Sequence, residues 1–75
     1  MIWLLSEYLG GADETIQTVI VGDDRVFYVH YCNGYHSVIE GVNNLMHFLN
    51  GDVSRRMACF DTEDETIDFL EKYDR

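Results

Sequence analysis

A chain of 75 residues can enclose only one small hydrophobic core, and this limit governs what the sequence can fold into. A domain of this size buries only about 60% of the surface that its unfolded chain exposes, which leaves little room for an enclosed active site. The chain contains no proline and no run of glycine and serine that would mark a linker. We therefore expect a single domain, residues 1–75, whose function lies on its surface.

The charge of the chain is strongly negative, with 14 acidic residues against 5 basic ones and a formal net charge of −9. Hydrophobic residues still make up 47% of the sequence, so a packed core is expected in place of disorder. DNA, RNA and anionic membranes are bound mainly by cationic residues, and this balance argues against all three as direct ligands. The same charge would attract a basic protein surface.

The sequence predicts a cytoplasmic protein without catalytic, metal or cofactor sites. Its first apolar run is only five residues long, too short for a signal peptide or a membrane span. In the cytoplasm, Cys32 and Cys59 are expected to be buried thiols without a disulfide. No spacing typical of metal ligands and no glycine-rich phosphate loop is present. A reactive thiolate would need a positive environment, so we do not expect an enzyme.

The apolar pattern predicts an α+β domain of order βββαβα, with a small antiparallel sheet of three to four strands and two helices packed on one side. Strands are predicted over residues 1–9, 15–21, 25–32 and 53–60, and helices over residues 37–50 and 63–73. A hairpin turn is expected at residues 22–24. Each predicted helix opens with a capping box, Ser37 with Glu40 and Thr62 with Glu65. Gly41 falls inside the first predicted helix.

Acidic side chains gather along the second predicted helix. Residues 61–75 contain seven acidic and two basic residues. The spacing of three, four and three residues places one set of carboxylates on a single side of the helix: Asp61, Asp64, Asp68 and Glu71. Carboxylates on successive turns lie about 5 to 6 Å apart, near the phosphate spacing of a nucleic-acid strand. The stripe predicts either a solvated surface helix or a partner-binding surface that imitates DNA.

Three further residues complete the predicted partner-binding set. Glu65 and Asp74 add to the acidic charge of the same segment. Tyr35 falls in a predicted loop after Asn33 and Gly34, and exposed tyrosines often anchor protein interfaces. We therefore expect Tyr35 to be an exposed contact residue.

In length, net charge and acidic stripe, the chain resembles the small acidic inhibitors of bacteriophages and mobile elements, particularly anti-CRISPR proteins and DNA-mimic antirestriction proteins. The segment Phe60-Asp61-Thr62-Glu63, which leads into a short acidic helix, is of the kind they use. The resemblance implies a phage protein that acts in the host cytoplasm by binding a basic nucleic-acid-binding or PAM-reading surface of a CRISPR effector. Asp61, Asp64, Asp68 and Glu71 would carry that contact.

Two alternatives to an inhibitor stay open at this point. The first is a small regulatory interaction domain that forms a homodimer through a strand edge or the amide-rich face of the first helix. The second is an antitoxin-like partner of a basic toxin. A strong dependence of binding on salt would favour an electrostatic inhibitor or antitoxin over the homodimer.

Overall fold

The computed structural model describes the backbone of residues 1–8 and 13–74, and the side chains of residues 1–4 and 13–74. The end of the first predicted strand at Leu9 and the predicted loop glycines 10 and 11 lie outside these ranges. The elements are, in chain order, β1 (Ile2–Tyr8), β2 (Thr15–Val21), β3 (Arg25–Cys32), β4 (Tyr35–Glu40), α1 (Val42–Leu49), the 3-10 turn η1 (Val53–Arg55), β5 (Ala58–Phe60) and α2 (Glu63–Glu71). The predicted α+β class is confirmed.

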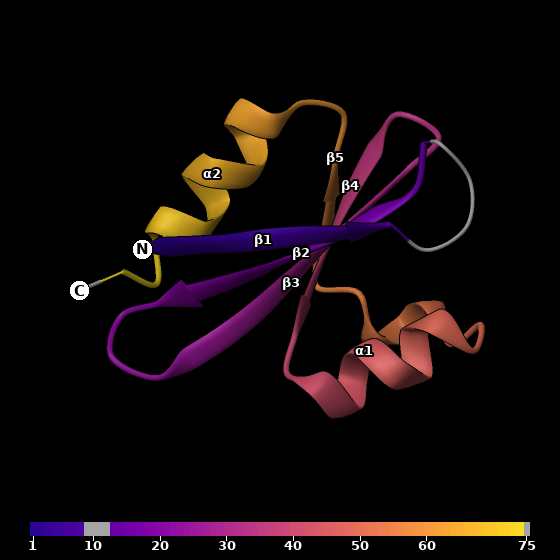
Figure 1. Cartoon of the computed structure of the whole chain (residues 1–75), viewed down its shortest axis with the longest axis horizontal. Coiled ribbons are helices and arrows are strands. Elements are labelled where there is room, and N and C mark those ends of the chain that lie inside the picture. Colours follow the sequence, from indigo (N-terminus) through magenta and orange to yellow (C-terminus); the bar gives the residue numbers. More distant parts are fainter. Residues whose placement is uncertain (9–12, 75) are drawn as a thin grey trace.

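The strands form one antiparallel sheet in the order β1-β2-β3-β4-β5, so that each strand pairs with its neighbours in the sequence (Figure 1). The predicted hairpin at residues 22–24 joins β2 to β3. A register shift between Trp3 and Ser6 interrupts the pairing of β1 with β2. Such bulges are common at sheet edges, and β1 is one edge of this sheet.

The prediction of three to four strands in the order βββαβα is wrong, because residues 35–40 form a strand and not the start of a helix. Asn33 and Gly34 both have positive φ angles, 54° and 83°. A two-residue loop with this geometry matches the type I′ turn, whose twist suits a tight hairpin. The chain therefore returns at once, and Tyr35 pairs directly with Cys32.

The pattern of β4 looked helical because both faces of this strand are covered. Ser37, Val38 and Ile39 are consecutive and all buried, so the strand lacks the usual alternation of polar and apolar residues. Ser37 is no helix cap, since its hydroxyl donates to the Cys59 Sγ at 4.0 Å. Gly41 lies directly before α1 with φ 86°, so the helix begins at Val42.

The predicted strand over residues 53–60 is confirmed only for its last three residues, Ala58–Phe60. Its first residues instead form η1, which Asp52 caps by accepting the backbone N–H of Ser54 at 3.2 Å. The short β5 pairs with β4 and forms the second edge of the sheet.

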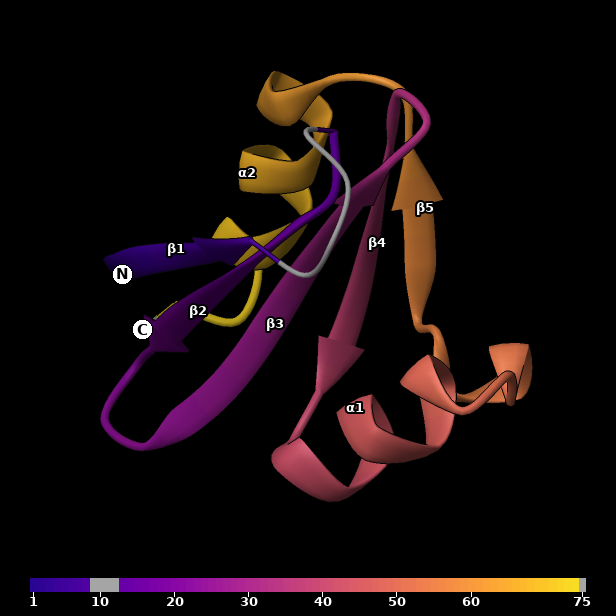
Figure 2. The ribbon, with the colours of Figure 1, turned by 45° about the vertical axis from the view of Figure 1, so that its right-hand side comes forward.

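The two helices lie on opposite faces of the sheet, so the prediction that they share one side is wrong (Figures 1 and 2). Side chains of a strand alternate between the faces, and Val38 and Ile39 accordingly belong to different clusters. The cluster beneath α2 contains Val19, Val21, Phe27, Val29, Val38 and Leu70. The cluster beneath α1 contains Ile16, Ile39 and Leu45.

Candidate partner-binding surface

Thr62 caps helix α2 as predicted, but the Glu65 carboxylate binds the Thr62 hydroxyl and not its backbone N–H, the contact that a full capping box requires. The Thr62 Oγ1 accepts the backbone N–H of Glu65 at 3.2 Å and donates to the Glu65 carboxylate at 2.9 Å. Thr66 and Leu70 are fully buried against the sheet, which fixes the side of α2 that faces the core. The Glu65 side chain is thus engaged in the start of the helix.

The outward side of α2 carries Asp64, Asp68 and Glu71, as the spacing predicted, whereas Asp61 precedes the N-cap Thr62 and lies outside the helix. We call the set the α2 acidic stripe: Asp61, Asp64, Asp68 and Glu71. All four are exposed. Within the described side chains, none of them has a hydrogen bond or an ion pair. Three of them, from Asp64 to Glu71, extend over about 10 Å of the helix axis.

The described cations do not neutralise this stripe. Arg25 binds both carboxylate oxygens of Glu40 at 2.8 Å, and Arg55 pairs with Asp52 at 3.3 Å. The hydrogen bonds from Arg25 hold the pKa of Glu40 below its usual value. Two acidic residues outside α2 are therefore already paired, whereas α2 itself contains five acidic residues and no basic one.

Asp74 belongs to a different environment from the stripe. Its carboxylate accepts from the amino group of Met1 at 3.0 Å and from the backbone N–H of Gly22 at 3.2 Å. These hydrogen bonds lower the pKa of Asp74. Asp74 thereby connects the chain after α2 to β1 and to the turn between β2 and β3.

Tyr35 is 54% exposed, as the sequence predicted, but it begins strand β4 and does not lie in a loop, and it is not beside the stripe. Its position in β4 points it to the face of the sheet that α1 covers, whereas α2 packs on the other face. It lines an open pocket of about 460 Å³, together with His30, Cys32, Asn33, Ser37, Phe48, Arg56 and Cys59. The structure therefore separates Tyr35 from the acidic residues.

The pocket brings one histidine, one serine and two thiols near one another. His30 is held by Glu14, with 2.8 Å between its Nε2 and the Glu14 Oε2. Both thiols are free, and β4 lies between Cys32 and Cys59. The prediction that both are buried is wrong, because Cys59 lies in the edge strand β5 and is exposed, while Cys32 is only partly buried. Two strand spacings separate them by about 10 Å, beyond the reach of a disulfide. Among the described residues, no group of three or more potential ligands is placed to hold a metal ion.

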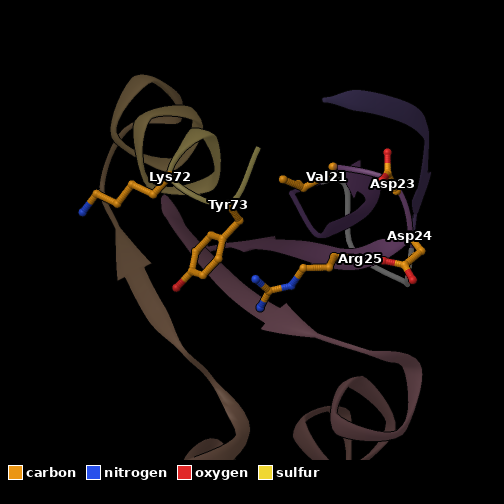
Figure 3. A pocket seen from close by; sticks show the side chains of 7 residues that line it. Val21, Asp23, Asp24, Arg25, Lys72 and Tyr73 are labelled. Carbon is orange, nitrogen blue, oxygen red and sulfur yellow. The ribbon is translucent and has the colours of Figure 1, made fainter. Parts of the chain in front are cut away.

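A second pocket, of about 470 Å³, lies between the β2–β3 turn and the end of α2 (Figure 3). The Arg25 guanidinium carbon lies 4.5 Å from the ring centroid of Tyr73. The positive charge of Arg25 is therefore engaged by this ring and by the Glu40 carboxylate. Figure 3 shows the Lys72 side chain extending away from Arg25. No anion-binding pair of cations is therefore formed here.

Sequence reasoning missed the pocket around Tyr35 because the register of β3, β4 and β5 is needed to find it. Ser37 lies opposite both His30 and Cys59, which brings residues from three strands together. The Asn33-Gly34 pair is the signal that would have predicted this pairing.

Comparison with known proteins finds none that is similar to this chain. No protein-family model matches the chain, and no curated protein or solved structure shows significant similarity to it. Neither helix in the described ranges is long and apolar enough to cross a membrane.

Proposed function

We propose that the chain is an inhibitor that acts by binding, with the α2 acidic stripe occupying a basic nucleic-acid-binding surface of a host defence effector such as a CRISPR complex. The observation that carries the proposal is the row of exposed carboxylates that have no hydrogen bond or ion pair to the side chains that the structure describes, on a helix that contains no lysine or arginine. An effector that binds nucleic acid offers the complementary charge.

The charge density of the stripe supports imitation of DNA. Three carboxylates from Asp64 to Glu71 extend over about 10 Å of the helix axis. One DNA strand carries a phosphate for about every 3.4 Å of its axis, so the two densities are of the same order. A row of arginines and lysines spaced for phosphates can therefore meet this side of α2.

Helix stability does not account for the whole stripe. Acidic residues in the first turn, such as Asp64, interact favourably with the positive end of the helix dipole. Glu71 lies in the last turn, where the dipole is negative and the turn itself contains no basic residue, although the C-cap that follows is Lys72. A carboxylate held in an unfavourable position supports a role outside the folding of the helix.

The experiment measures displacement of DNA from a purified Cas9-type effector with its guide RNA. A fluorescent target duplex is bound first, and its anisotropy is followed as the protein is added. We expect the protein to release the duplex, and its affinity for the effector to fall at least about tenfold between low and physiological salt. The variant Asp64→Lys, Asp68→Lys, Glu71→Lys should no longer release it.

A matched control variant separates the effect of the stripe carboxylates from the effect of the net charge of the protein. The variant Asp13→Lys, Asp23→Lys, Asp24→Lys changes the net charge by the same amount, at exposed residues outside α2. It should displace the duplex much more strongly than the stripe variant. Equal loss in both variants, or full displacement by the stripe variant, would show that the stripe is not the binding surface. Absence of displacement by the wild type would rule out inhibition of this effector class at DNA binding.

A further inference from the structure

Four large apolar side chains on the α1 side of the sheet are exposed, and we call them the α1 apolar patch. Their exposed fractions are 57% for Ile2, 56% for Val42, 56% for Met46 and 40% for Leu49. Isolated exposed apolar residues are common on soluble domains, whereas a continuous patch marks an interaction surface. These four side chains form such a patch if they adjoin one another.

The sheet register joins the strand and helix parts of the patch. Ile2 lies opposite Ile20, and Ile20 lies opposite Val26, so an apolar row crosses β1, β2 and β3 on one face. The backbone N–H of Gly41 donates to the Val26 carbonyl at 3.0 Å, which places the start of α1 at the end of this row. Val42 follows directly, and the patch continues onto the helix.

Helix α1 turns its surplus apolar side toward β2 and β1. Leu45 and Phe48 cover the core, while Val42, Met46 and Leu49 form a neighbouring stripe at spacings of four and three residues. Asn44, on the other flank of the helix, binds Arg55 of η1 at 3.0 Å. Because η1 leads into β5, the stripe must face the opposite way. Helix α1 contacts β3 and β4, and Figure 2 shows it set away from β1.

We infer that a second copy of this chain covers the α1 apolar patch. Helix α1 contains no aspartate, glutamate, lysine or arginine, although the chain has a net charge of −9. Two copies therefore repel one another through most of their surface and least through this face. A two-fold axis brings the same patch together from both copies, and a neutral apolar patch is complementary to itself. A basic partner, in contrast, is complementary to α2.

The inferred dimer leaves the proposed inhibitory surface free. Because α1 and α2 pack on opposite faces of the sheet, a contact through the α1 patch directs both α2 helices away from the dimer axis. The two interfaces also respond to salt in opposite ways. Salt screens the repulsion between two acidic copies and so favours the dimer, whereas it weakens attraction between α2 and a basic surface.

The experiment is sedimentation equilibrium of the protein alone, from about 5 µM to about 1 mM, at about 50 mM and about 500 mM sodium chloride. We expect a reversible monomer–dimer equilibrium that tightens at the higher salt. A monomer throughout this range, or a dimer that dissociates on adding salt, would overturn the inference. The effector plays no part, so failure here leaves the proposed function untouched.

Two valine substitutions provide the matched test. Val42→Asp places a charge in the patch at the first residue of α1, where the helix dipole favours it, so the fold should be kept. Val53→Asp makes the same change at a residue that is 65% exposed and lies in η1, outside the patch. We expect Val42→Asp to weaken the dimer at least about tenfold and Val53→Asp to leave it unchanged. Equal effects, with unchanged circular dichroism, would overturn the inference.

Discussion

Helices α1 and α2 are nearly equal in length, eight and nine residues, yet they have opposite surfaces. α1 has no aspartate, glutamate, lysine or arginine and more apolar side chains than the sheet covers, while α2 has five carboxylates and no lysine or arginine. The sheet holds them on opposite faces, so neither surface disturbs the other (Figure 1). A domain of this size can therefore present a hydrophobic surface and an electrostatic one that do not compete for the same partner.

The two helices also differ in how firmly the core holds them. Among the described residues, the cluster with Leu70 contains six buried residues and packs against five partly buried ones. The cluster with Leu45 contains three buried residues and two partly buried ones. The helix that presents the acidic stripe is thus the better anchored of the two, as the proposed binding surface would require.

The largest predicted effect tests this difference in anchoring. Leu70→Ala should lower the free energy of unfolding by about 3 to 4 kcal/mol, because the side chain is fully buried in the larger cluster. Leu45→Ala should cost about 2 kcal/mol, since its cluster is smaller and closer to solvent. Urea unfolding followed by circular dichroism measures both. Equal losses would show that the two helices are anchored alike.

The starts of the helices provide a second comparison. Gly41 precedes α1 with φ 86° and ψ 147°, a conformation almost confined to glycine, and an added Cβ would meet only open space. Gly41→Ala should therefore cost about 2 kcal/mol through backbone strain alone. Thr62→Ala should cost about 1 kcal/mol through loss of the cap on α2, and Thr62→Ser should restore most of it. A neutral Gly41→Ala would contradict the strain argument.

The sequence predicted α2 correctly and α1 poorly, for a physical reason. The start of α2 is signalled locally, by Thr62 and Glu65 three residues apart and by the apolar residues after them. In the fold, Thr62 and Glu65 contact each other at the start of the helix, as their spacing predicts. Ser37 and Glu40 show the same spacing, but both are used in the sheet, where Glu40 binds Arg25. Burial of β4 on both faces removed the alternation by which a strand is recognised.

The residues of the candidate site also differ in how well the sequence predicts their positions. The acidic stripe needs only the helical period, so spacing placed Asp64, Asp68 and Glu71 together on one side. Asp74 and Tyr35 depend on tertiary structure, because the partners of Asp74 are Met1 and Gly22, far away in the sequence. No local pattern shows which face of the sheet Tyr35 occupies before the pairing of β3 with β4 is known.

The smallest predicted effect separates the stability of α2 from its proposed role in binding. Asp64→Lys and Glu71→Lys change the net charge equally but lie in the first and last turns of α2. Asp64→Lys should destabilise the fold and Glu71→Lys should stabilise it, with a difference of about 1 kcal/mol that shrinks at high salt.

Urea unfolding at low and high salt measures this difference, and binding to the effector is compared in parallel. Both substitutions should weaken binding, because both remove a carboxylate from the stripe. Opposite changes in stability with the same change in binding would mean that Glu71 is kept against the preference of its own helix, as expected for a contact residue. Shifts in stability of equal size and sign would instead mean that net charge governs both positions, and the dipole argument for the stripe would fail.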